Sequence, residues 1–242
     1  MKQILFPLYE ILVNRTPARI KSILKFLGIH KLNFLLMDKH TAELAFQRMW
    51  AVEFRNNKNQ VLEYWEKYRY LNEIKTIVGI CDGSKILDVG CGISTVLHFV
   101  KGKKYGIDPL AESYKEIYIY PEDICISKGE GENIPFTDTY FDIIFCSNVL
   151  DHVRDPQKTI DNILKVLRKD GFLVLTVEIF KEKIGRNAAH PHSLTKTNVV
   201  RFLGNRFKVV FEKESPWIGL RKYVIGKRSS LHNELILVLQ KL

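Results

Sequence analysis

The sequence has few cysteines, and their spacing excludes the two frameworks that cysteines most often build. Four cysteines occur in 242 residues, and no two of them form a C-x-x-C pair. A zinc ribbon needs such pairs, and a disulfide-rich secreted domain needs a higher density of cysteines. We therefore expect no zinc site, no disulfide scaffold and a reduced, cytoplasmic setting.

Long apolar runs and low-complexity tracts are also missing. No stretch reaches the roughly 18 consecutive apolar residues that a membrane-spanning helix needs. The apolar start of the chain is interrupted by Pro7 and Glu10 and has no small-residue cleavage site, so a secretory signal is not expected. With 14 glycines, 8 prolines and 46% hydrophobic residues, the composition excludes collagen-like and disordered chains and predicts a globular protein.

The charge is unevenly distributed along the chain. The formal net charge of +10 divides into +5 for residues 1–84, −4 for residues 85–178 and +9 for residues 179–242. An acidic middle between basic ends suggests a central site for a cationic or hydroxyl-rich ligand, in surroundings that attract anions.

From Lys85 onward, short apolar runs alternate with helical patterns, which is typical of a parallel sheet built from βα units. Seven strands are expected, over residues 85–90, 104–108, 124–129, 141–148, 171–178, 207–214 and 234–241. Helices are expected between them, over residues 94–100, 110–117, 155–168 and 195–203. The link over residues 215–233 shows no clear crossover helix, so the last two strands are candidates for antiparallel pairing.

The pattern before Lys85 is helical throughout. It predicts a helical N-terminal extension over residues 1–59, followed by the main domain over residues 60–242. Helices are expected over about residues 39–54 and 60–78. We find no internal repeat.

The most informative motif is a Gly-x-Gly turn at the end of the first expected strand. Residues 86–92 read Ile-Leu-Asp-Val-Gly-Cys-Gly and precede a helix that starts near Ser94. Glycine has no Cβ, so the chain can turn tightly and a flat ligand can approach the backbone. The third glycine of a dinucleotide motif is replaced by Thr95, which disfavours a dinucleotide. A tight strand-to-helix turn without a ligand is the alternative interpretation.

An acidic residue follows at the end of the second expected strand. Asp108 lies 20 residues after Asp88 and precedes Pro109. A carboxylate in this place can accept hydrogen bonds from both ribose hydroxyls of an adenosine over the glycine turn. An ordinary strand-end aspartate is the alternative, but the combination with the glycine turn favours ribose binding.

Together with three later segments, these residues resemble the class I S-adenosylmethionine-dependent methyltransferases. Glu130-Gly131-Glu132 resembles the segment after the third strand, where an acidic residue and the following amide contact the adenine edge. Residues 139–153 resemble the fourth strand and its loop, with Asn148 and Val149 beside the methionine part of the cofactor. Residues 166–173 resemble the turn into the fifth strand.

The resemblance covers about residues 60–242 and implies an α/β fold. That fold is a Rossmann-like three-layer sandwich with a seven-stranded, mostly parallel sheet whose last strand is antiparallel. It also implies S-adenosyl-L-methionine as cofactor and a small molecule, a saccharide or a lipid-linked molecule as methyl acceptor. The cofactor-binding residues that it implies are Asp88, Gly90, Cys91, Gly92, Asp108, Pro109, Glu130, Gly131, Glu132, Asn148 and Val149.

Three histidines are candidate catalytic bases for an acceptor hydroxyl, because imidazole titrates near neutral pH. A structural place in the cofactor loop is the favoured alternative for His152. His190 and His192 follow the fifth strand, where lining the acceptor pocket and a structural role are equally favoured. Histidines at i and i+2 without a Cys or Asp companion are poor metal ligands, so no metal is expected.

Two other functions stay open. RNA methylation is compatible with the basic ends, although no RNA-binding module is appended. A non-catalytic binding module that keeps the fold is the other alternative. DNA-base methylation is not expected, because Ser147-Asn148-Val149-Leu150 lacks the Pro-Pro-aromatic and Pro-Cys steps of such enzymes.

Two basic amphipathic segments, residues 17–27 and 217–228, bear on the partners of the protein. Apolar groups interleaved with cations suit peripheral contact with an anionic membrane surface. Packing against the domain, or against a second subunit in a homo-oligomer, is the favoured alternative.

Overall fold

The computed structural model describes residues 39–181, 190–216 and 232–242. The contacts divide the chain into two units, residues 1–42 and 43–242, and nearly all described residues belong to the second. The two segments with a predicted membrane contact, residues 17–27 and 217–228, lie outside the described residues.

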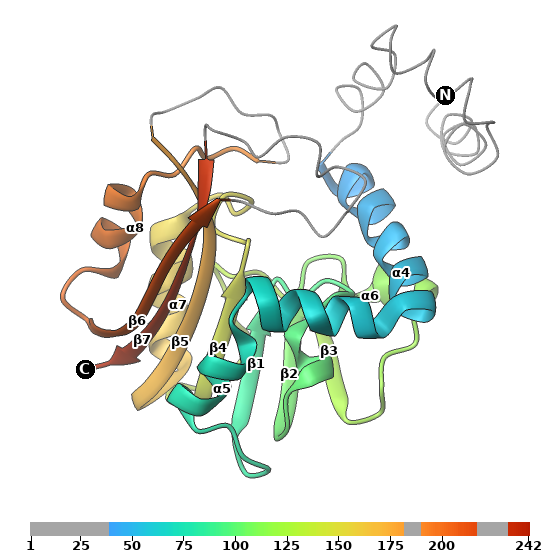
Figure 1. Ribbon diagram of the computed structural model, residues 1–242, viewed down its shortest axis with the longest axis horizontal. Helices are drawn as coiled ribbons and strands as arrows, with labels where there is room; N and C mark the ends of the chain where they lie inside the picture. Colours follow the sequence, from blue (N-terminus) through green and yellow to red (C-terminus); the bar gives the residue numbers. More distant parts are fainter. Residues whose placement is uncertain (1–38, 182–189, 217–231) are drawn as a thin grey trace, which may run out of the picture. The chain divides into compact units, whose positions relative to one another are not determined.

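A seven-stranded sheet forms the centre of the second unit (Figure 1). Its strands are β1 (Lys85–Val89), β2 (Lys103–Asp108), β3 (Ile124–Lys128), β4 (Phe141–Ser147), β5 (Leu167–Phe180), β6 (Phe207–Pro216) and β7 (His232–Lys241). The order is β3-β2-β1-β4-β5-β7-β6. The strands β1 to β5 are parallel, and β7 runs antiparallel between β5 and β6. The predicted strand number and the antiparallel last pair are confirmed.

Helices cover both faces of this sheet. They are α4 (Lys39–Tyr68), α5 (Leu71–Val78), α6 (Ala111–Ile117), α7 (Pro156–Val166), α8 (Lys196–Leu203) and the short 3₁₀ helix η2 (Val96–Phe99). Apolar residues of α7 and α8 share one core with the sheet, and those of α4 and α5 share the other. This gives the three layers that the resemblance implied (Figure 1).

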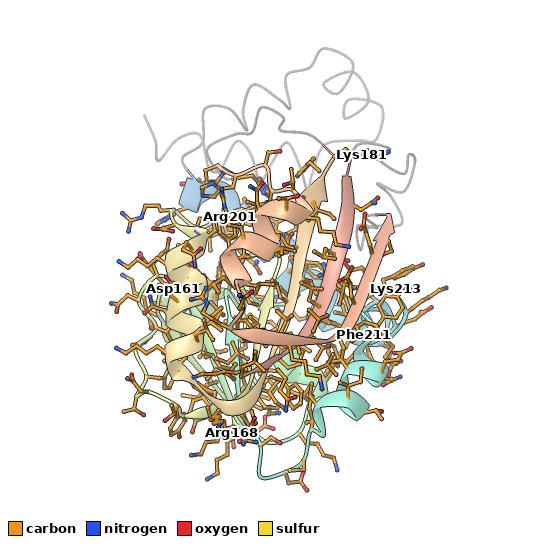
Figure 2. All side chains as sticks on the ribbon, turned by 90° about the vertical axis from the view of Figure 1, so that its left-hand side faces the viewer. Asp161, Arg168, Lys181, Arg201, Phe211 and Lys213 are labelled. Carbon is orange, nitrogen blue, oxygen red and sulfur yellow. The ribbon has the colours of Figure 1, made fainter. Side chains whose placement is uncertain are left out.

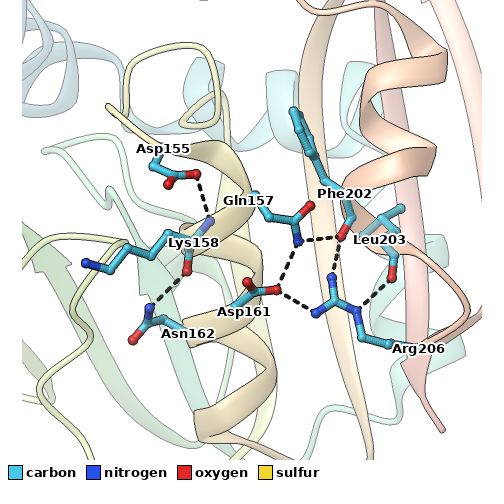
Figure 3. A network of polar contacts seen from close by, with 8 residues as sticks. All are labelled: Asp155, Gln157, Lys158, Asp161, Asn162, Phe202, Leu203 and Arg206. Atoms are coloured by element: carbon cyan, nitrogen blue, oxygen red, sulfur yellow. Dashed lines mark hydrogen bonds and ion pairs between the residues drawn. The ribbon is translucent and has the colours of Figure 1, made fainter.

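Polar contacts fix α7 against α8 on the outer side of the first core (Figure 3). Asp161 of α7 pairs with Arg206 at 2.5 Å, and Arg206 also donates to the carbonyl oxygens of Phe202 and Leu203. Gln157 donates to both Asp161 and the Phe202 carbonyl. Helix α7 is therefore joined to the C-terminal end of α8 and to the residues that follow it.

The helices differ from the sequence prediction in two places. The sequence predicted two helices, over residues 39–54 and 60–78, and the predicted break between them is wrong. Helix α4 continues to Tyr68, and the break falls at Tyr70, whose φ is 54°. The helix expected over residues 94–100 is a four-residue 3₁₀ turn, because the Thr95 hydroxyl accepts a hydrogen bond from the amide of Leu97.

Strand β5 is longer than expected at both ends. Its first residue, Leu167, already pairs with Phe141, four residues before the expected start at Gly171. Arg168 and Lys181 mark the two ends of this strand (Figure 2).

Candidate active site

The glycine turn after β1 is closed by the neighbouring strand. Gly90 and Gly92 have φ values of 69° and 52°, which side-chain-bearing residues rarely adopt. The amides of Gly90 and Cys91 donate to the Ile107 carbonyl at 2.8 and 3.1 Å. A Cβ at Gly90 would lie 2.5 Å from a methyl group of Val149. Glycine is thus required both by the backbone and by the packing of the loop after β4.

Helix α4 reaches the same turn through Gln47, a residue that the sequence analysis did not single out. The Gln47 side-chain oxygen accepts a hydrogen bond from the Ile93 amide at 2.8 Å, and its nitrogen donates to Glu43 at 2.9 Å. A Cβ at Gly92 would lie 2.8 Å from Gln47 Nε2. The space beside Gly92 is therefore taken by a side chain of the protein.

Asp108 presents a fixed carboxylate at the end of β2. Its two oxygens accept hydrogen bonds from the amides of Leu110 at 2.9 Å and Gly92 at 3.3 Å. The residue is 8% exposed, and burial raises the pKa of its carboxyl group to about 6. Pro109, the next residue, is exposed. The ionised carboxylate of Asp108 fits the role predicted for it, the binding of ribose hydroxyls.

Asp88 is more deeply buried than Asp108 and contacts the residues that follow the glycine turn. It is 3% exposed and accepts a hydrogen bond of 2.6 Å from the hydroxyl of Thr95. Burial raises the pKa of Asp88 to about 7. Thr95 stands where a dinucleotide motif has its third glycine, and its hydroxyl joins Asp88 to the η2 turn.

The loop after β3 carries three predicted cofactor-binding residues, of which Glu130 and Gly131 are expected at the adenine edge. Glu130 is half-exposed and pairs with Arg154 at 3.4 Å. Gly131 is buried, and Glu132 accepts hydrogen bonds from the amides of Arg154 at 2.7 Å and Asp155 at 3.3 Å. Glu132 therefore holds the start of α7, and Glu130 is the carboxylate of this loop that is more open to a ligand.

The loop after β4 offers an unsatisfied polar atom. Asn148 has a φ of 58°, and its amide donates to the Thr176 carbonyl at 2.8 Å. Its side-chain oxygen is buried and finds no hydrogen-bond donor within the described part of the chain. Because an unpaired buried carbonyl costs about 1–3 kcal/mol, Asn148 Oδ1 fits a ligand that brings a donor, such as the amino group of S-adenosylmethionine.

Further along this loop, the structure brings together residues that the sequence separates. Asp151 is fully buried, and its carboxylate lies 2.8 Å from Nδ1 of His190, 39 residues away. Nε2 of His152 lies 3.8 Å from the same carboxylate, and the two imidazole rings are 4.1 Å apart between centroids. The acidic companion that His190 lacked in sequence is therefore supplied by Asp151.

His192 holds this arrangement in place. Its Nε2 lies 2.9 Å from the Val153 carbonyl and 3.2 Å from the Arg154 carbonyl, so this nitrogen carries the hydrogen and donates a hydrogen bond to the backbone. Its own amide donates to the Asp151 carbonyl at 3.4 Å. These contacts join the loop after β5 to the loop after β4.

Comparisons with known proteins identify a methyltransferase domain in this chain. Residues 87–175 match the family model described as a methyltransferase domain. The chain is 25% identical over 171 residues to a malonyl-[acyl-carrier protein] O-methyltransferase from Porphyromonas gingivalis, covering 63% of this chain and 65% of that protein. It is 24% identical over 150 residues to a tRNA U34 carboxymethyltransferase from Campylobacter lari, covering 57% and 51%. Residues 87–175 thus form a methyltransferase domain, in agreement with the resemblance to the S-adenosylmethionine-dependent methyltransferases.

The fold of this methyltransferase domain occurs in solved structures with different activities. The structure of the [4+2]-cyclase SpnF matches with a TM-score of 0.56 and 17% identity, covering 72% of this chain and 80% of that one. The alignments span about half to two thirds of the two curated relatives. Methyltransferases of this family use S-adenosylmethionine as methyl donor. No helix among the described elements has the length and apolar character needed to cross a membrane.

Proposed function

We propose that the protein transfers the methyl group of S-adenosylmethionine to an oxygen of a small molecule, a saccharide or a lipid-linked acceptor. The observation that carries this proposal is the composition of one loop. Asn148, with its unsatisfied oxygen on the cofactor side, lies three residues before Asp151, which contacts His190. Three residues span at most about 10 Å, so the donor and acceptor sides adjoin.

Two sets of residues have different roles: one binds the methyl donor, and the other positions the acceptor. When bound, S-adenosylmethionine supplies a methyl group on a positively charged sulfur. Asp108 and Glu130 bind the ribose and the adenine, and Asn148 accepts a hydrogen bond from the amino group. The loops of His152 and His190 hold the acceptor hydroxyl in line with the methyl group.

In an in-line displacement, one bond forms at the methyl carbon as another breaks. The acceptor oxygen forms a bond to the methyl carbon as the carbon–sulfur bond breaks, and the electron pair stays on sulfur. The acceptor proton leaves towards the side of the loop that carries His152 and His190, both of which are partly exposed. The oxygen therefore becomes nucleophilic without a covalent protein intermediate.

Transfer to RNA is the second candidate, and the similarity to a tRNA carboxymethyltransferase supports it. The two candidates differ in their dependence on salt, because binding of a polyanion weakens steeply as counterions are added. Unchanged acceptor turnover between 50 and 200 mM salt is expected for a small neutral acceptor, whereas a steep loss would favour RNA.

The proposal is tested by calorimetric titration with S-adenosylmethionine, followed by an acceptor screen with labelled methyl donor. Asp108→Ala should weaken cofactor binding by about 1.5–3 kcal/mol, as for a hydrogen bond to a charged group. Unchanged affinity of that variant would contradict the assignment of the cofactor site. Flotation with anionic liposomes at low and high salt tests the separate prediction of peripheral membrane contact.

A further inference from the structure

We infer that Asp151, His152 and His190 bind one divalent transition-metal ion at the acceptor side of the site. Each of the three side chains offers one donor atom, and the donor atoms lie within 4.8 Å of one another. Two imidazole nitrogens and one carboxylate oxygen form the donor set that zinc and non-haem iron use in catalytic centres.

The distances suit a shared ion after a small side-chain movement. Zinc–nitrogen and zinc–oxygen bonds of about 2.0–2.1 Å place two donors of a tetrahedral centre about 3.4 Å apart. Nδ1 of His190 lies 2.8 Å from Oδ2 of Asp151, and Nε2 of His152 lies 3.8 Å from Oδ1 of the same carboxylate, so one distance is below and the other above that value. Rotation of the His152 ring, which is only partly buried, would bring its nitrogen inward.

The surroundings favour a catalytic centre over a closed structural one. Asp151 is fully buried, whereas the side chains of His152 and His190 are 22% and 32% exposed. The inner side of an ion would therefore be held by the protein, and its outer side would stay open to water or a ligand. The contacts of His192 with the backbone fix the distance between the two loops that supply the donors.

The chemical class of the outer ligand follows from the position, and this step rests on the proposed function. An open coordination place next to Asn148 and Val149 suits an alcohol, phenol or carboxylate oxygen of the acceptor. A divalent ion lowers the pKa of a bound hydroxyl and orients its oxygen. The proton passes to solvent, and the oxygen attacks the methyl carbon as described above.

A metal-free pair, with His190 as base and Asp151 as its partner, is the arrangement that the test must separate from the ion site. Cobalt(II) chloride is added to the full chain after treatment with EDTA, and binding is followed by calorimetry and by visible absorption. We expect one cobalt ion per chain, with ligand-field absorption and no thiolate charge-transfer band. His152→Gln and His190→Gln should each weaken cobalt binding at least tenfold.

Matched variants control for adventitious binding and for misfolding. Cys81 and Cys125 are exposed thiols, so the double variant Cys81→Ser/Cys125→Ser should bind cobalt as the wild type does. Far-UV circular dichroism and the unfolding midpoint show whether each histidine variant is folded. No cobalt binding by the wild type, or equal binding by folded histidine variants, would overturn the site.

Turnover gives a second, independent outcome. Activity that is lost with EDTA and restored by zinc or cobalt supports the ion. Activity that resists EDTA but is lost in His190→Gln would identify the metal-free base and overturn the inference. Cofactor titration without metal keeps the two proposals apart, because a failure to bind S-adenosylmethionine contradicts the proposed function and leaves the cobalt result standing.

Discussion

Arg69 and Glu234 form a buried ion pair that joins the chain segment after α4 to strand β7. The guanidinium nitrogen lies 2.9 Å from the carboxylate, and the two side chains are 9% and 4% exposed. Arg69 also donates to the hydroxyl of Tyr64 at 3.1 and 3.2 Å. Glu178, buried too, lies opposite Glu234 across the β5–β7 pair. Arg69 therefore lies close to two buried carboxylates.

Removal of this cation should destabilise the fold strongly. Arg69→Met leaves Glu234 buried without its partner, and the loss of one member of a buried pair costs about 3–5 kcal/mol. Glu112→Gln is the control, because Glu112 and Lys115 form an exposed pair on α6, worth less than about 1 kcal/mol. Urea unfolding of both variants measures the difference, and equal stabilities would show that the buried pair contributes little.

Cofactor affinity should depend on pH through Asp108. Its pKa is raised by burial to about 6, and in the proposed cofactor site the ionised form would accept hydrogen bonds from both ribose hydroxyls. Affinity should therefore rise as pH increases through 6 and be about tenfold weaker at pH 5 than at pH 7.5. Calorimetry across this range checks the profile, and Asp108→Asn should bind more weakly with a flat profile. A pH dependence that persists in this variant would point to another group.

Asp88 should make the protein less stable as pH rises. Burial raises its folded-state pKa to about 7, whereas the unfolded value is about 3.9. The folded state therefore holds an extra proton between these values. Its stabilising effect is full below pH 4 and is lost as pH rises through 7, with a slope of about −1.4 kcal/mol per pH unit. Asp88→Asn should make the measured slope less negative by about 1.4 kcal/mol per pH unit between pH 4.5 and 6.5 in denaturant titrations, and the part that remains belongs to Asp108, whose pKa is also raised. An unchanged slope would assign it elsewhere.

The contact between Gly92 and Gln47 can be tested with a double-mutant cycle. Gly92→Ala forces a residue with a side chain into φ 52° and places its Cβ 2.8 Å from Gln47. We expect a loss of at least about 1–2 kcal/mol from the backbone alone, plus the clash. In the Gln47→Ala background only the backbone part should remain. Equal losses in both backgrounds would show that the Gln47 side chain moves aside freely.

Local sequence patterns were sufficient for most of the fold. Alternation of apolar runs and glycine or proline turns placed each of the seven strands within a few residues. The division of α4 was predicted wrongly, because the polar residues 55–59 resemble a linker although none of them prevents a helix. Helix propensity alone cannot decide whether the helix continues through these residues. Packing of Phe54 and Val61 into one core keeps it continuous.

The predicted cofactor positions could be named from sequence because each lies near the end of a strand or in the loop after it, within segments that resemble a known family. Asp151 and Gln47 were missed, since their roles depend on contacts with residues 39 and 46 positions away. One signal was available for Asp151. It is a carboxylate within the mostly apolar stretch Val149–Val153, where a charged residue needs a specific partner. No comparable signal marks Gln47 on a helix with many polar residues.

The place of β7 in the sheet determines when the sheet can close during synthesis of the chain. It is the last of the seven strands to leave the ribosome, yet it lies between two strands that precede it. Until β7 emerges, β5 has one open edge and β6 has no neighbour in the sheet. The nascent chain therefore exposes unpaired backbone on both strands, and closure of the sheet waits until β7 has been synthesised.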